Sequence, residues 1–447
     1  MTDRREQQRP NEAPRAAQEV PQMTQPNDSS LITRRRLLGV GGAGVLTIAT
    51  GGTIAALARR GEPAIAAGAA RARAAQAAPF AGTKLRLVAS DGYISLPGRA
   101  EPLFVMGFNA AELDHSTRRV IRDHKGKIKW PAPIIGVDED VELMITLTNA
   151  GFQTRPDLAD SHTIHWHGFR NPAALFDGVP EVAVAVPVRR SFPYYYKPSD
   201  AGTYMYHCHF EDVEHVQMGM TGIVFVRPVQ NRGTATLPAG KYAYNDGDGS
   251  TAYDREVTLL LNEVDPAPHD LLEAVQEYAW YKYSPKFWVI NGRAFPDTIM
   301  PTDDPSLPSQ PTSSLIQANG GDRVLLRFAS LGYQQHAMQL PGIRMKVVGE
   351  DATHLRGPGG ADLSYETHSI YIGPGESRDV LFTAPAFGDG AVAGTHPTYG
   401  RFNTYQLKNR SHNKLVNDTA AGLGGMVTEV RIYENPLPAQ TAPNETF

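Results

Sequence analysis

Hydrophobic and polar residues alternate along most of the chain from Lys84 onward. Residues 84–88 and 141–147 place aliphatic side chains at every second position, which is typical of a β-strand with one buried face. The pattern resumes at Glu256 and continues to Tyr433. Glycine and proline are frequent, at 42 and 34 residues, and supply the turns that short strands need. The sequence therefore predicts an all-β chain.

One stretch of this pattern occurs twice. Residues 135–151 align without a gap with residues 316–332, and Gly219-Met220 stands opposite Gly425-Met426. Both copies are expected to bury the same face of a strand, because three alternate hydrophobic positions coincide: Leu143, Ile145 and Leu147 fall on Val324, Leu326 and Phe328. The repeat predicts two domains of one architecture, each the size of a Greek-key β-sandwich.

Composition divides the chain into five parts. Residues 1–79 are expected to be a disordered leader with a targeting signal, and residues 80–230 the first β-domain. We expect a Gly/Asn/Asp-rich linker at residues 231–255, the second β-domain at residues 256–435 and a Pro/Ala/Thr-rich tail at residues 436–447. The formal net charge of -4 gives no electrostatic reason to expect a nucleic-acid partner.

The leader contains a recognisable targeting pattern. Residues 33–38, Thr-Arg-Arg-Arg-Leu-Leu, open an uncharged stretch that ends at Ala58, and Ala75-Gln-Ala77 follows it. A twin arginine, a Gly/Ala-rich apolar run and small residues after it resemble a twin-arginine export signal with a cleavage site. The alternative is a retained transmembrane anchor, which the six glycines of the run disfavour. We expect export to the periplasm or the cell exterior.

The single cysteine, Cys208, excludes an intrachain disulfide. A lone thiol can be a simple core residue, but its surroundings indicate otherwise. Residues 162–168 (His-Thr-Ile-His-Trp-His-Gly) and residues 206–220 contain Cys208 and six of the 14 histidines. Residues two apart on a strand share a face, so the paired histidines of each segment project together and Cys208 points the other way.

The two faces suit two adjacent metal sites. A thiolate, two imidazoles and a weak thioether form the ligand set of a blue copper site, and His162, Cys208, His215 and Met220 supply that set, with Met218 as the competing thioether. Imidazoles on the opposite face suit further copper ions that bind oxygen species. These four side chains belong to His165, His167, His207 and His209. The Cys208 backbone would link the two sites through the histidines on either side of it.

These segments resemble multicopper oxidases, whose pattern is H-x-x-H-x-H-G followed by H-C-H and then H-x-x-x-G-M. The resemblance covers residues 84 to about 435, and its two-domain plan is similar to two-domain laccases and copper nitrite reductases. It implies two tandem cupredoxin-like domains, a homotrimer, a small phenolic or metal-ion reductant and dioxygen as the acceptor. The resemblance implies that type 1 copper is bound by His162, Cys208, His215 and Met220. It implies that His165, His167, His207 and His209 form half of a type 2/type 3 copper cluster. The catalytic electron path that it implies consists of Cys208, His207 and His209.

The ligand loop departs slightly from the common laccase pattern. His215 lies seven residues after Cys208, two more than is usual, and the extra residues are acidic. Glu211, Asp212 and Glu214 are most simply a solvated loop, and alternatively they attract a cationic or metal-ion substrate. We interpret Trp166 as a packing residue rather than a redox-active one.

The second domain lacks most of the matching ligands. Opposite residues 162–168 stands His336-Ala-Met-Gln-Leu-Pro-Gly342, and no cysteine follows residue 230. His336 and Met426 are therefore expected to be packing residues. Because only half of the expected histidines are present, an electron carrier or copper-binding protein without turnover stays open. A nitrite reductase using His167 and His207 also stays open, although those enzymes carry an aspartate where this chain has His165.

Overall fold

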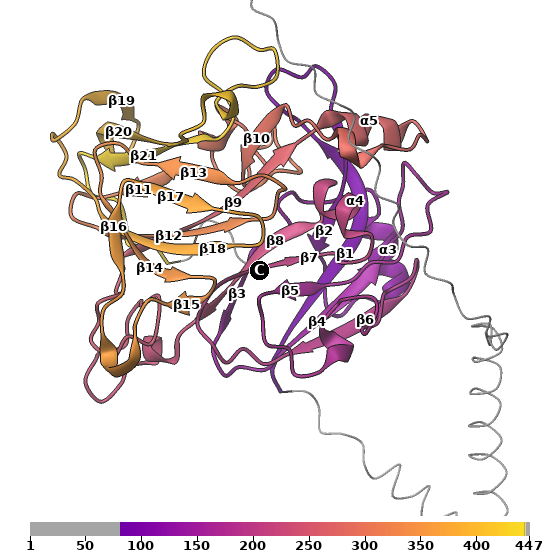
Figure 1. The fold of residues 1–447 in the computed structure, drawn as a ribbon, viewed down its shortest axis with the longest axis horizontal. Coiled ribbons are helices and arrows are strands. Elements are labelled where there is room, and N and C mark those ends of the chain that lie inside the picture. Colours follow the sequence, from indigo (N-terminus) through magenta and orange to yellow (C-terminus); the bar gives the residue numbers. More distant parts are fainter. Residues whose placement is uncertain (1–80, 442, 444–447) are drawn as a thin grey trace, which may run out of the picture. The chain divides into compact units, whose positions relative to one another are not determined.

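The computed structural model describes residues 81–441 and 443, and the expected leader at residues 1–79 lies outside the described residues (Figure 1). Strands dominate, and they form two sheets in the first half of the described chain and two in the second. No helix in this described part is long and apolar enough to cross a membrane.

The first half is a sandwich of two four-stranded sheets. One sheet has the order β2-β1-β4-β6, with strands at Leu103–Ala110, Thr83–Ile94, Leu143–Asn149 and Ser191–Tyr196. The facing sheet has the order β3-β8-β7-β5, with strands at Ile135–Asp138, Thr221–Arg227, Gly202–His207 and His165–His167.

The second half repeats this order with additional strands. Its first sheet runs β10-β9-β12-β18-β14-β15, with β16 on β14, at Phe287–Ile290, Arg255–Val264, Arg323–Ser330, Ser377–Thr383, Met345–Glu350, Thr353–His354 and Tyr365–Thr367. Its second sheet runs β11-β21-β20-β13-β17, with β19 on β20, at Ile316–Ala318, Val427–Tyr433, Gly400–Asn409, His336–Gln339, Ser369–Ile372 and Val392–His396.

Helices are short and lie at the ends of the strands. The α-helices are α3 at Thr117–His124, α4 at Asp212–Gln217 and α5 at Pro266–Glu273. The 3₁₀ turns η1 to η6 are at Ala174–Phe176, Val229–Arg232, Trp280–Lys282, Asp297–Ile299, Pro358–Gly360 and His412–Lys414.

The repeat seen in the sequence is a repeat of structure. Strand β4 runs parallel to β1 just as β12 runs parallel to β9, and β3 runs parallel to β8 just as β11 runs parallel to β21. The three coincident hydrophobic positions of β4 and of β12 are all 0% exposed and fill the core of their own sandwich. The predicted all-β class with two tandem Greek-key β-sandwiches is confirmed.

The two halves pack together through the sheet that carries the candidate site. Strand β7 contacts β12 and β18, and β8 contacts β9 (Figure 1). The junction contains aliphatic side chains and a buried ion pair in which Arg327 Nε lies 2.9 Å from Glu256 Oε2. Thr203 of β7 donates a hydrogen bond of 2.6 Å to Asp379 of β18. Strand β7, which ends at His207, is therefore held against the second half.

Candidate metal centre

Three of the predicted donors meet at Cys208. The Sγ atom of Cys208 lies 3.8 Å from His162 Nδ1 and 3.4 Å from His215 Nδ1. The ligand atoms of these three residues all lie within 4.8 Å of one another. These side chains and that of Met220 are 0% exposed. Three donors of the predicted set are thus brought to one buried place, and Met220 is buried in the same core.

Backbone hydrogen bonds hold these donors in place. His162 precedes β5, and its backbone exchanges hydrogen bonds of 3.1 and 2.8 Å with Val186. The Cys208 N–H donates to the Met220 carbonyl at 3.2 Å, and the Met220 N–H donates to the His215 carbonyl at 3.0 Å. The segment from Cys208 to Met220, here called the ligand loop, therefore closes on itself and carries α4 with His215 in its middle.

The electrostatics of this group suit a metal cation. Burial lowers the pKa of His162 well below its usual value, so its ring is neutral and keeps a lone pair. Burial also acts to lower the pKa of His215, but the Cys208 thiolate and Asp160 outweigh it and raise that pKa to about 10. A metal ion binds the neutral ring, so it would displace the His215 proton on binding. A thiolate with two imidazoles is a donor set that copper favours, so the residues fit copper.

The four-histidine cluster, which consists of His165, His167, His207 and His209, lies on the other side of Cys208. In the β5–β7 pair His165 stands directly opposite His207, and their ring centres are 5.2 Å apart. The donor atoms of His165, His167 and His207 lie within 4.8 Å of one another. The His209 ring joins by contact, 5.1 Å from His165 and 5.5 Å from His207, but its donors are outside that group of three.

Hydrogen bonds set which ring nitrogens face the cluster. His207 Nδ1 lies 2.9 Å from the Cys208 carbonyl, and His165 Nδ1 lies 2.6 Å from the Asp177 carbonyl. A ring that donates from Nδ1 presents the Nε2 lone pair to a metal. Burial lowers the pKa of His207 to about 3 and also lowers the pKa of His165 and of His167. Three neutral imidazoles are therefore available near pH 7.

The second half of the chain closes over this cluster. Gly375 has φ +79, and a Cβ atom there would lie 2.8 Å from His167 Nε2. Its N–H donates to the Ser330 carbonyl of β12 at 2.8 Å, so the turn between β17 and β18 is fixed against the sheet. Only glycine fits between this turn and the His167 ring without a shift.

Two polar residues at the site were missed in the sequence. The Thr163 N–H donates to Cys208 Sγ at 3.4 Å, and its hydroxyl accepts from the His209 N–H at 2.9 Å. Asp160 lies 3.7 Å from His215 Nε2 and forms a group with Glu211, Glu214 and His215 whose ligand atoms are within 4.8 Å. The sequence offers one signal for Asp160 and Thr163, which is their position close to His162. This signal is weak, because a loop has no hydrophobic periodicity that would assign its side chains to a face.

The predicted acidic residues separate into two groups. Glu211 and Glu214 join Asp160, whereas Asp212 Oδ2 lies 3.8 Å from His209 Nδ1 on the other side of the loop. Trp166 is fully buried and stacks on Tyr196, with 4.2 Å between ring centres. Every histidine in the metal-binding groups found within residues 81–441 comes from the first half.

Paired β-sandwiches with a buried cysteine, two histidines and a methionine at one end define a copper protein of the cupredoxin class. Two family models described as multicopper oxidase match residues 114–231 and residues 255–392. The chain belongs to the multicopper oxidase family, and copper is the cofactor that this membership implies.

Curated relatives are similar over part of their length. Laccase-5 of Arabidopsis thaliana is 27% identical over 260 residues, which cover 57% of this chain and 38% of that protein. Copper resistance protein A of Escherichia coli is 23% identical over 303 residues, which cover 60% of this chain and 46% of that protein. In both cases the matched region is less than half of the relative.

Solved structures share the fold over most of both chains. A blue copper oxidase from Nitrosomonas europaea aligns with a TM-score of 0.56 and 21% identity, covering 78% of this chain and 85% of that one. A copper nitrite reductase from Nitrosomonas europaea aligns with a TM-score of 0.52 and 18% identity, covering 79% and 94%. At these identities the similarity establishes the two-domain cupredoxin fold.

Proposed function

We propose that this protein is a copper-dependent oxidoreductase that takes electrons from a small reductant and delivers them to dioxygen. In this proposal His162, Cys208, His215 and Met220 hold type 1 copper, and the four-histidine cluster holds type 2 or type 3 copper. Copper bound in these places supplies one-electron transfer at the first and oxygen binding at the second. The observation that carries the proposal is that Cys208 belongs to one donor group while His207, its neighbour in sequence, belongs to the other.

The chain's own residues would perform three tasks. Cys208 provides a covalent path, because its backbone connects directly to His207 and His209. Burial of the first donor group excludes water from the thiolate and keeps the site rigid, which favours rapid electron transfer. The lowered pKa of His207 keeps its ring neutral, so that few protons compete for the lone pair.

The reductant is proposed to bind beside the ligand loop. A cavity of about 410 Å³ is lined there by Glu214 and Met218 and by α5 and the segment that follows it, including Leu272, Tyr278 and Trp280. Such a mixed aromatic and acidic lining suits a phenol. The adjacent carboxylates of Asp160, Glu211 and Glu214 suit a metal ion instead.

Two sets of substitutions separate these donor classes. Glu211→Gln is expected to raise KM for ferrous or cuprous ions and to leave phenol oxidation nearly unchanged. Trp280→Ala is expected to do the reverse, because its side chain lines the cavity without contributing a charge. Equal effects of both variants on both donors would refute two separate donor positions.

Copper content and oxygen consumption test the function itself. The purified protein is expected to bind more than one copper per chain, to be blue, and to consume oxygen with a phenolic or metal-ion donor. A fully loaded blue protein that consumes no oxygen with any donor would contradict the oxidase proposal.

The degenerate second half favours one alternative, a blue copper electron carrier or copper-binding protein. Positions that align with His165 and His167 are Gln339 and Pro341. One copper per chain would support this alternative, and three or four would exclude it. Nitrite reduction is not favoured, because the chain retains His165 and His209, and an anaerobic nitric oxide assay tests it.

Export and assembly complete the proposal. The twin-arginine segment at residues 33–38 supports export to the periplasm or cell exterior, and N-terminal sequencing of the exported protein tests cleavage after residue 77. We also propose a homotrimer, since two-domain relatives place the second copper centre between subunits. Light scattering of the copper-loaded protein tests the assembly.

A further inference from the structure

The second half contains the geometric counterpart of the first donor group. The Asn409 N–H donates to the Met426 carbonyl at 3.0 Å, as the Cys208 N–H does to Met220. The Met426 N–H donates to the Lys414 carbonyl at 3.0 Å, as the Met220 N–H does to His215. The four counterparts of the type 1 donors, here called the remnant site, are His336, Asn409, Lys414 and Met426.

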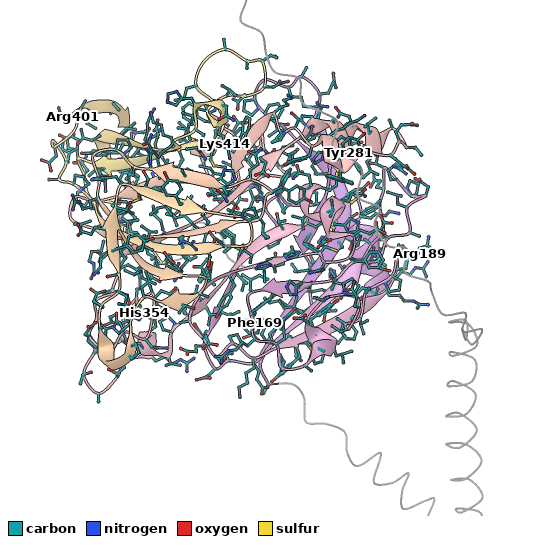
Figure 2. All side chains as sticks on the ribbon, in the orientation of Figure 1. Phe169, Arg189, Tyr281, His354, Arg401 and Lys414 are labelled. Atoms are coloured by element: carbon teal, nitrogen blue, oxygen red, sulfur yellow. The ribbon has the colours of Figure 1, made fainter. Side chains whose placement is uncertain are left out.

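The Lys414 side chain completes the remnant site at the position that His215 has in the first half. Lys414 Nζ lies 3.4 Å from His336 Nδ1, and Asn409 Nδ2 lies 3.4 Å from the same nitrogen and 3.3 Å from Met426 Sδ (Lys414 is labelled in Figure 2). Lys414 Nζ also donates to the Gln335 carbonyl at 2.5 Å. Lys414 is only 8% exposed, and the other three residues are 2% exposed or less. The Lys414 amino group thus lies beside the ring nitrogen that corresponds to the one facing Cys208 in the first half.

Glu263 of β9 connects the remnant site to the two tyrosines beside it. Its Oε2 atom lies 3.2 Å from His336 Nε2. Its Oε1 atom accepts hydrogen bonds from the backbone N–H groups of Tyr333 and Gln334 and lies 3.2 Å from the Tyr283 hydroxyl. Glu263 is fully buried, so it holds these groups in one arrangement. Burial lowers the pKa of Lys414, and the Glu263 carboxylate acts to raise it.

These tyrosines contact the helix that carries His215. The Tyr283 hydroxyl lies 3.0 Å from Gln217 Oε1, and the Tyr333 hydroxyl donates to the Val213 carbonyl. The two rings are packed together, with centres 5.3 Å apart. Val213 and Gln217 lie near the two ends of α4, with His215 between them. Both ends of this helix are therefore attached to the second half.

We propose that Glu263, Tyr283 and Tyr333 form a clamp that positions His215, and that the remnant site has exchanged metal binding for this role. Side chains that orient a metal ligand determine the affinity and the redox properties of the metal. A clamp on α4 fixes the distance between His215 Nδ1 and Cys208 Sγ, which is 3.4 Å. The inference deepens the proposed function and rests on it, because it assigns positioning residues to the proposed type 1 copper site.

The test removes the two hydroxyl groups without changing the rings. Tyr283→Phe and Tyr333→Phe are compared with the unmodified protein and with Tyr244→Phe. Tyr244 is the matched control, because it is a buried tyrosine of the expected linker whose hydroxyl donates to Asp379 of the second half rather than to the ligand loop. Two readouts are used: hydrogen exchange of residues 211–218 in the metal-free protein, and the visible and paramagnetic resonance spectra and reduction potential of the copper-loaded protein.

The expected result is specific to the clamp. Loss of one hydrogen bond is expected to accelerate exchange in residues 211–218 roughly five- to tenfold. The same two variants are expected to shift the blue absorption band and the reduction potential. Tyr244→Phe is expected to leave the exchange rate, the absorption band and the reduction potential unchanged. Glu263→Gln, which keeps the shape and removes the charge opposite Lys414, is expected to act like the two tyrosine variants.

Each other outcome has one meaning. Unchanged exchange and spectra in Tyr283→Phe and Tyr333→Phe would overturn the clamp. Faster exchange with an unchanged spectrum and potential would also overturn it, because the contacts would then be purely structural. An unmodified protein that binds no blue copper, with exchange still accelerated in the variants, would refute the proposed copper function and leave the attachment of α4 in place.

Discussion

The turn that covers the four-histidine cluster allows a sharp test of the second copper position. In Gly375→Ala the new Cβ atom would lie 2.8 Å from His167 Nε2. An ordinary contact is about 3.4 Å or more, so the ring or the turn has to retreat by roughly 0.6 Å. The residue also has φ +79, where a side chain costs on the order of 1 kcal/mol.

A displacement of this size exceeds what a metal site tolerates. Ligands have to be held within about 0.5 Å of their working positions, and disturbing the support of a ligand typically weakens metal binding by about 10- to 100-fold. We expect Gly375→Ala to weaken copper binding at the four-histidine cluster by this factor. The blue site should be unaffected, because His162, Cys208 and His215 lie on the other side of the strand.

The assay is a copper titration followed by metal analysis and paramagnetic resonance, which separates blue copper from other copper. Gly373→Ala is the matched control in the same turn, since its Cβ would meet nothing closer than 3.5 Å. Loss of the second signal in Gly375→Ala, with an intact blue band, is the expected result. Equal copper content and equal spectra in the two variants would refute the reasoning that this turn supports His167.

Three other predictions follow from the donor groups. Cys208→Ser is expected to abolish the blue band and to leave copper at the four-histidine cluster, and metal analysis with visible spectroscopy checks it; a persisting blue band would exclude Cys208 as the ligand. Burial lowers the pKa of His207 to about 3 from an ordinary 6.5. Its contribution to the stability of the metal-free protein is therefore complete above pH 6.5 and is lost as the pH falls toward 3, on the order of 3–5 kcal/mol in total. Urea unfolding between pH 7 and pH 4 measures this loss, and a flat stability profile would contradict burial of the neutral ring. Asn409→Cys combined with Lys414→His is expected to add one blue copper per chain at the remnant site, and an unchanged copper content would show that the backbone match with the first half is insufficient.

Local pattern predicted the strands and most of the donors, because their spacing follows from strand geometry. The alternation in residues 135–151 and 316–332 identified the repeat, and the hydrophobic positions are buried as expected. The same period of two assigned the paired histidines and Cys208 to opposite faces, and the structure brings three donors of each predicted group together. The boundaries of the domains stay predictions, and so do the roles of the ligands, which copper analysis will test.

The sequence by itself determined the fold class and the donor chemistry, because both depend on residue type and on spacing within a strand. Only the tertiary structure decided which distant residues control the donors. Asp160 beside His215, Gly375 against His167, and Lys414 in the remnant site all depend on contacts between segments without a shared period. The packing of the two halves sets those contacts, and for this reason the linkage from Glu263 to α4 could not be seen in the sequence.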